Sequence, residues 1–239
     1  LNKTGLKNYG RGILWSQGEA DSFSNGLSTE QYKSSFETLM SYWQEDYPNI
    51  QNYFIFQTRD CDCGTISSGR KKIKEAQRLV ALENENVFIM PTTGMQVHTD
   101  NCHFPFYNGY EKFALRIFPV VMTEIYGITL QEQIYAPMLT AISVNGNILE
   151  IITDSESLMQ NTTINNYLLN KLNEDFIFSD NTTIVGFEIS SNKLIFDLSQ
   201  TPSNNAKLSF IGFFSNIDAN ITNGLSLIHI SEPTRQEAI

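Results

Sequence analysis

An aspartate and a histidine three residues apart, Asp100 and His103, carry the clearest chemistry in this 239-residue sequence. Ester hydrolysis by a serine needs an imidazole that removes the hydroxyl proton and a carboxylate that fixes the tautomer of that imidazole. Both residues share one short loop, so Asp100 could reach back to His103 without another element. Asp-x-x-His is common by chance, and the alternative interpretation is a polar loop with an ordinary histidine. His98 has no such spacing to a carboxylate, although Asp100 is near it.

A second segment, Gln17-Gly18-Glu19, follows the short apolar run at residues 13–15. A side-chain amide at a strand end can donate an N–H to a developing oxyanion, so Gln17 is a candidate oxyanion-hole residue. Gly18 would let the backbone turn closely beside a ligand. Glu19 and Asp21 could brace the loop by hydrogen bonds. The alternative is a plain turn from strand to loop.

The elements around these segments alternate between strand and helix patterns. Residues 12–15, 53–57 and 87–90 are predicted as buried strands, and residues 28–47, 68–83 and 108–127 as helices. Ser28 with Gln31 is predicted to form a capping box. Such alternation favours an α/β fold, a parallel sheet with helices on both faces, whose sites lie at the carboxyl ends of the strands. Arg59, directly after the second strand, could touch a substrate there.

Residues 137–225 show a different pattern of short strand-like segments separated by turns. Asn145-Gly146 between two apolar segments predicts a hairpin. The spacing of the segments favours a small β-sandwich-like accessory domain, joined to an α/β domain at residues 1–127 by a linker at 128–136. Residues 226–239 resemble a translated cloning scar, so we do not expect them to belong to this domain.

Composition narrows the classes of function. The formal net charge is -10, which argues against nonspecific nucleic-acid binding. No apolar run is long enough for a transmembrane helix. Cys61, Cys63, Cys102 and His103 lack zinc-finger spacing, so loop cysteines or one local disulfide are favoured over a metal site. The basic run at residues 70–74 is interpreted as a solvated helix face.

The two chemical segments together resemble a known family, the sialate O-acetylesterase-like carbohydrate esterases, a branch of the SGNH (GDSL-like) hydrolases. The similarity covers roughly residues 8–127. It rests on the segments at 15–21 and 100–103 and on the intervening helical residues, among them Tyr32, Phe36, Trp43, Ile73 and Gln77. It implies a flavodoxin-like three-layer α/β/α domain and an O-acetylated carbohydrate as substrate. It also implies no cofactor, and it leans towards secretion or the periplasm.

The resemblance implies roles for three residues: Gln17 in the oxyanion hole, and Asp100 and His103 in a Ser-His-Asp triad. The family's early Gly-Asp-Ser or Gly-Gln-Ser segment is absent, because Ser16 and Ser67-Ser68 lack its context and no Gly-x-Ser-x-Gly elbow occurs. We therefore expect an N-terminally truncated fragment, inactive by itself. The rival hypotheses are a non-catalytic carbohydrate-binding or adhesion protein on the same fold, and an SGNH hydrolase that acts on lipid or other esters.

Overall fold

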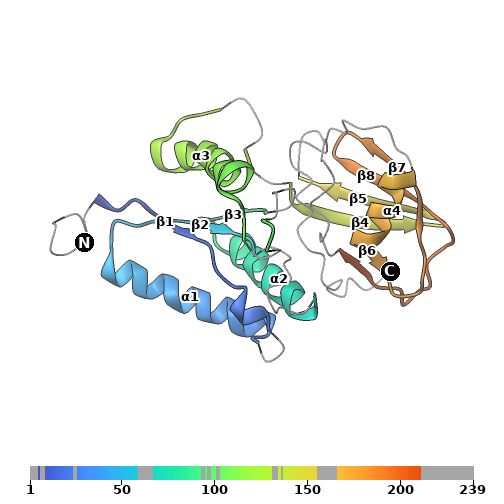
Figure 1. The fold of residues 1–239 in the computed structure, drawn as a ribbon, viewed down its shortest axis with the longest axis horizontal. Coiled ribbons are helices and arrows are strands. Elements are labelled where there is room, and N and C mark those ends of the chain that lie inside the picture. Colours follow the sequence, from blue (N-terminus) through green and yellow to red (C-terminus); the bar gives the residue numbers. More distant parts are fainter. Residues whose placement is uncertain are drawn as a thin grey trace. The chain divides into compact units, whose positions relative to one another are not determined.

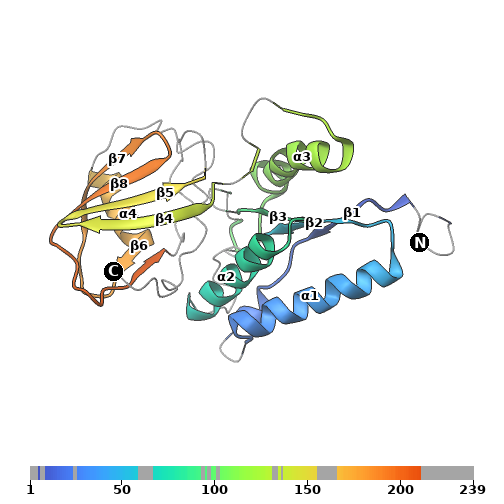
Figure 2. The ribbon, with the colours of Figure 1, turned by 180° about the vertical axis from the view of Figure 1, so that it is seen from behind.

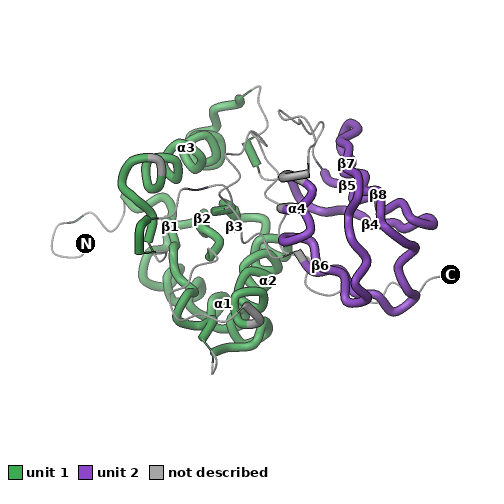
Figure 3. Tube along the Cα trace, turned by 45° about the vertical axis from the view of Figure 1, so that its right-hand side comes forward, with its two compact units in different colours: residues 1–92, 97–135 green, residues 93–96, 136–239 purple. Residues whose placement is uncertain are grey.

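The computed structural model describes residues 5, 9–23, 26–58, 67–92, 95, 98–100, 103–130, 134–135, 137–154 and 166–210. The chain divides into two compact units, coloured separately in Figure 3. Unit 1 comprises residues 1–92 and 97–135, and unit 2 comprises residues 93–96 and 136–239.

Unit 1 is built on a parallel sheet of three strands in the order β1-β2-β3. These strands are β1 (Gly12–Trp15), β2 (Asn52–Phe56) and β3 (Val87–Met90). Helices α1 (Thr29–Asp46) and α2 (Ser67–Glu83) connect successive strands, as parallel pairing requires. The prediction of a mixed α/β fold with a parallel sheet is confirmed.

Helices pack against both faces of this sheet (Figures 1 and 2). Side chains of α1 and α2 form one core cluster with the strand side chains that point their way, among them Tyr53 and Ile55. Helix α3 (Glu111–Tyr126) packs on the opposite face, where Ile117 and Val120 meet Phe54. Successive residues of β2 thus enter opposite cores, because side chains alternate along a strand.

Local sequence signals define the ends of the helices in unit 1. The backbone N–H of Gln31 donates to Ser28 Oγ at 3.2 Å, and the N–H of Ser28 donates to Gln31 Oε1 at 2.9 Å. The predicted capping box is therefore confirmed. Helix α3 follows a single π turn, η4 (Phe106–Tyr110), and ends at Tyr126, where Gly127 in the left-handed region caps it.

Two of the four basic residues in the run at 70–74 of α2 are buried, which corrects the prediction of a solvated face. Arg70 and Lys74 are only 8% and 5% exposed, whereas Lys72 is exposed. Positions 73, 74 and 77 follow position 70 by three, four and seven residues, which places all four side chains on one face of the helix. The two basic side chains therefore share the face that carries Ile73 and Gln77 into the core. The basic character of the run does not indicate which of its residues are buried, because the face that a residue occupies depends on the period of the helix.

Unit 2 contains an antiparallel sheet in the order β4-β5-β8-β7. Its strands are β4 (Leu139–Asn145), β5 (Ile148–Thr153), β7 (Ile184–Ser190) and β8 (Lys193–Leu198). The predicted hairpin at Asn145-Gly146 is confirmed, since β4 and β5 pair across it with Gly146 at a φ of 60°. Helix α4 (Asn166–Asp175) and the pair β6 (Phe176–Phe178) and β9 (Leu208–Phe210) complete the described part.

Unit 2 has its own apolar core. One face of the four-stranded sheet packs against residues of α4 and β6, among them Leu172 and Phe176.

The cloning-scar interpretation of residues 226–239 falls on residues that the structure does not describe. In the described parts of both units, no helix is long and apolar enough to cross a membrane.

Replacing the cap of α1 tests the local origin of this helix. Ser28→Ala should lower the free energy of unfolding of unit 1 by about 1 kcal/mol, because it removes one half of the capping box. Urea unfolding followed by tryptophan fluorescence reports on unit 1, since Trp15 and Trp43 both lie there. Ser35→Ala, at an exposed interior position of the same helix, should be neutral or slightly stabilising. Equal effects of the two changes would contradict the capping role.

Candidate active site

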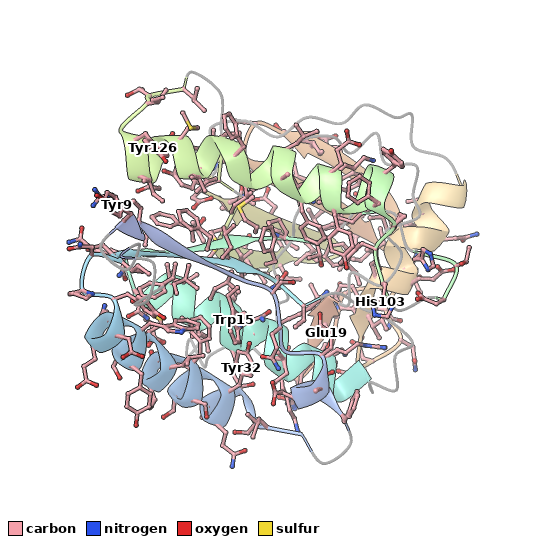
Figure 4. The ribbon with its side chains drawn as sticks, turned by 60° about the vertical axis from the view of Figure 1, so that its left-hand side comes forward. Tyr9, Trp15, Glu19, Tyr32, His103 and Tyr126 are labelled. Atoms are coloured by element: carbon pink, nitrogen blue, oxygen red, sulfur yellow. The ribbon has the colours of Figure 1, made fainter. Side chains whose placement is uncertain are left out.

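The candidate site lies in unit 1, at the carboxyl ends of its parallel strands. Gln17 follows β1 by two residues, Thr58 follows β2 by two, and Asp100 and His103 lie on the loop between β3 and η4. Parallel strands bring their carboxyl ends to one edge of the sheet, where α/β folds place ligands. Figure 4 shows the labelled side chains of Glu19 and His103 towards this same end. The fold therefore collects residues that are more than eighty positions apart in sequence.

Asp100 holds His103 through both of its carboxylate oxygens. Oδ2 lies 2.7 Å from His103 Nδ1, and Oδ1 accepts the backbone N–H of His103 at 2.9 Å. In the neutral imidazole the carboxylate places the proton on Nδ1, which leaves Nε2 with a lone pair. The His103 side chain is 68% exposed, so a hydroxyl can approach that nitrogen. This arrangement can serve as an oriented general base.

His98 also approaches the carboxylate of Asp100, which sequence reasoning did not anticipate. Its Nδ1 lies 3.3 Å from Asp100 Oδ2, and its backbone N–H donates to the carbonyl oxygen of His103 at 2.8 Å. The contact of His103 with Asp100 is shorter and has the additional backbone bond, so His103 is the histidine that Asp100 orients. The two-residue spacing of His98 and Asp100 was the signal that could have revealed the contact.

The side chain and the backbone of Gln17 are each held by separate partners. Its amide Nε2 donates to Asp21 Oδ2 at 2.8 Å. Its carbonyl oxygen accepts the hydroxyl of Tyr32 at 3.1 Å and the amide of Gln77 at 3.0 Å. An amide nitrogen carries two hydrogens, so the bond to Asp21 uses one and orients the other. That second N–H can donate to an oxyanion.

Gly18 is required by packing of the protein around it. Its φ is 139°, in the region that side chains disfavour. A Cβ at this position would lie 2.6 Å from Thr58 Cγ2 and 2.9 Å from Ile73 Cγ2. The close neighbours that the structure assigns to Gly18 therefore belong to α2 and to the segment that follows β2.

Glu19 and Asp21 brace the turn that follows Gly18, through different atoms. The carbonyl oxygen of Glu19 accepts the backbone N–H of Ser22 at 3.1 Å and its hydroxyl at 2.6 Å. These bonds close the short helical turn η3 (Ala20–Ser22). Asp21, within that turn, receives the Gln17 amide. The bracing expected of these two residues thus comes from the main chain of Glu19 and the side chain of Asp21.

Several sequence candidates lie outside the described residues: Arg59, Cys61, Cys63 and Cys102. Ser16 is described and is exposed beside Gln17. Among the described residues, no group of three histidine, cysteine, aspartate or glutamate side chains could hold a metal ion. The sequence analysis gave Gln77 no site role, although its helical spacing from Ile73 and Val80 placed a polar residue on the inner face of α2 and was the signal for one.

Comparisons with known proteins agree with the resemblance predicted from the sequence. The family model for carbohydrate esterases described as sialic acid-specific acetylesterases matches residues 2–114, which contain both chemical segments. The fold matches the crystal structure of a carbohydrate acetylesterase from Xanthomonas citri with a TM-score of 0.65 at 16% identity. That match covers 88% of this chain and 47% of the other, so this chain spans about half the length of that protein. No curated protein matches the sequence.

The tautomer of His103 is a direct test of the geometry at Asp100. In ¹⁵N NMR spectra, at a pH where the ring is neutral, we expect the proton of His103 on Nδ1, because the carboxylate accepts it there. Asp100→Asn should move part of the population to the Nε2-protonated form, since an amide can turn its N–H towards Nδ1. His98→Gln should leave the tautomer of His103 as it is. A parent protein with His103 protonated on Nε2 would contradict the assignment.

Proposed function

We propose that this chain is part of a serine carbohydrate O-acetylesterase with an SGNH-like three-layer domain. The observation that carries the proposal is the Asp100–His103 pair, held by bonds of 2.7 and 2.9 Å, on the same sheet edge as Gln17. The family match over residues 2–114 supports the same class of reaction. Residues 137–225 are proposed to be an accessory domain of the same protein.

In the proposed mechanism, His103 Nε2 removes the proton from a serine hydroxyl, and the serine oxygen attacks the acetyl carbonyl. Asp100 stabilises the imidazolium that forms. The second N–H of the Gln17 amide donates to the oxyanion, a contact typically worth 10²–10³ in kcat. As the bond between the acetyl carbon and the sugar oxygen breaks, the imidazolium gives its proton to that oxygen, and the sugar leaves with a free hydroxyl. Water, activated by the same imidazole, hydrolyses the acetyl-enzyme to acetate and regenerates the serine.

The serine itself is proposed to lie upstream of Leu1, on a Gly-Asp-Ser or Gly-Gln-Ser segment. Such a segment would have to end at the same sheet edge to bring its hydroxyl within hydrogen-bond reach of His103. Ser16 is the nearest serine in sequence to Gln17, but it directly follows β1 without a glycine turn before it. We propose that the 239-residue chain alone is therefore inactive.

A group of exposed aromatic residues close to His103 in sequence supports a sugar as the substrate. Phe106 and Tyr107 are each 72% exposed and Tyr110 is 50% exposed, three to seven positions after His103. We call these three residues the aromatic ledge. Phe104 and Phe113 pack behind it, with ring centroids 4.6 Å apart. Exposed aromatic side chains of this kind commonly mark binding sites, and their flat apolar faces suit the C–H face of a sugar ring.

Activity of the longer protein that carries the upstream serine segment tests the proposed chemistry. His103→Ala should lower kcat for p-nitrophenyl acetate by roughly 10³-fold or more, because the base is lost. Ser16→Ala should leave kcat unchanged. Full activity of the His103→Ala protein would refute the mechanism. A protein that binds O-acetylated sugars but hydrolyses no ester would instead support the rival hypothesis of a carbohydrate-binding module.

A substitution in the aromatic ledge separates sugar binding from acetyl chemistry. Tyr107→Ala should raise KM for an O-acetylated sugar about fivefold, since stacking contacts contribute on the order of 1 kcal/mol. The same change should barely alter KM for p-nitrophenyl acetate, which has no sugar ring. Tyr42→Ala is the matched control, because Tyr42 is 59% exposed on α1, away from the loop that carries His103. Equal changes for both substrates would contradict the ledge's role.

A further inference from the structure

We infer that Gln77 and Tyr32 are positioning residues, which set the direction of the Gln17 side chain through its backbone carbonyl. Neither side chain has been given a role in the mechanism above, and both are buried, with exposures of 0% and 4%. The inference rests on the proposed function only for its effect on rate. Its geometric part, that these two residues hold Gln17 in place, stands on the contacts alone.

Gln77 joins the ends of two strands from a position on α2. Its Nε2 donates to the carbonyl oxygen of Gln17 at 3.0 Å and lies 3.2 Å from the hydroxyl oxygen of Tyr32. Its Oε1 accepts the backbone N–H of Thr58 at 2.8 Å. One amide therefore connects the residue after β1 with the residue after β2, and both donor hydrogens and the acceptor are used.

Tyr32 supplies the second bond to the same carbonyl, from α1. Its hydroxyl donates to the oxygen of Gln17 at 3.1 Å and accepts the indole N–H of Trp15 at 3.5 Å. Burial raises the pKa of this phenol, so its hydroxyl stays protonated and able to donate. The carbonyl of Gln17 thus has both of its lone pairs occupied, by donors from two different helices.

These bonds leave the peptide between Gln17 and Gly18 little freedom to rotate. The carbonyl on one side is held by Gln77 and Tyr32, and Gly18 on the other side is enclosed by Thr58 and Ile73. A fixed peptide plane restricts the backbone rotations that set the Cα–Cβ direction of Gln17, and Asp21 holds the far end of its side chain. An oxyanion donor must be aimed within a few tenths of an ångström to be effective.

An apolar residue at position 77 would be easier to bury, but it would remove the hydrogen bond that Gln77 donates to the carbonyl of Gln17. It would leave the N–H of Thr58 and one lone pair of Gln17 without their present partners inside the protein. Burial of a polar side chain is unfavourable unless its hydrogen bonds are made. The satisfied amide of Gln77 is consistent with a geometric function beyond filling space.

A pair of matched tyrosine changes tests the inference in the longer, active protein. Tyr32→Phe removes one donor to Gln17 and should lower kcat about tenfold, with KM changed by less than about twofold. Tyr53→Phe removes a buried hydroxyl that donates to the carbonyl of Met40 at 3.4 Å, in the same core but not at Gln17. It should keep the parent kcat. A similar loss of kcat in both variants would mean a merely structural role and would overturn the inference.

Two substitutions at position 77 add a test through the pH dependence of kcat. In Gln77→Glu, the protonated acid can still accept from Thr58 and donate to Gln17, whereas the ionised form cannot donate. The ratio of variant to parent kcat should therefore fall as pH rises. Gln77→Met has no titratable group, so its ratio should be low at every pH. A flat ratio near one for either variant would contradict the inference.

A readout without catalysis keeps the inference distinct from the proposed function. In the 239-residue chain, the ¹⁵N-labelled side-chain amide signals of Gln17 should shift in Tyr32→Phe and Gln77→Met and stay in place in Tyr53→Phe. Should the longer protein prove inactive, the proposed function fails, and these signals alone decide whether Gln17 is positioned by Gln77 and Tyr32. Unchanged Gln17 signals in both site variants would overturn the inference.

Discussion

Parallel pairing of three short strands is the constraint on which unit 1 depends. Strands β1, β2 and β3 contain only four or five residues each, and their parallel register brings three carboxyl ends to one edge. Helices bury both faces of the sheet, so polar groups collect at its edges and in the loops. Gln17 and Thr58 lie two residues beyond the ends of β1 and β2, and Asp100 and His103 lie on the loop that leaves β3, so the place of the site follows from this register.

The site combines two ways of positioning a side chain. Asp100 orients His103 within a single loop, because three residues suffice for both carboxylate oxygens to reach the same partner. Gln17 is positioned instead by residues from two helices, and its bond with Gln77 spans 60 positions of sequence. The first arrangement survives changes elsewhere in the fold, whereas the second depends on correct packing of α1 and α2 against the sheet.

Burial of the polar residues under the site is unfavourable in free energy, and only their hydrogen bonds offset this. Gln77 is fully buried, and it is acceptable there because its amide is bonded on every side to Gln17, Tyr32 and Thr58. The packing around Gly18 is also tight, since even one added carbon would collide with Thr58. The region is therefore rigid where the proposed chemistry requires a fixed donor, and exposed where His103 must meet a substrate.

The sequence by itself determined the features that depend on near neighbours: the capping box at Ser28, the hairpin at Gly146, the alternation that produces a parallel sheet, and the spacing of Asp100 and His103. It also carried the family resemblance, through segments that keep their order along the chain. Only the tertiary structure decided that the face of α2 with Arg70 and Lys74 is buried, and that Gln77 holds the carbonyl of Gln17. The physical reason is range: turns and caps are set by a few adjacent residues, whereas a buried hydrogen bond across 60 positions exists only after helices have packed on a sheet.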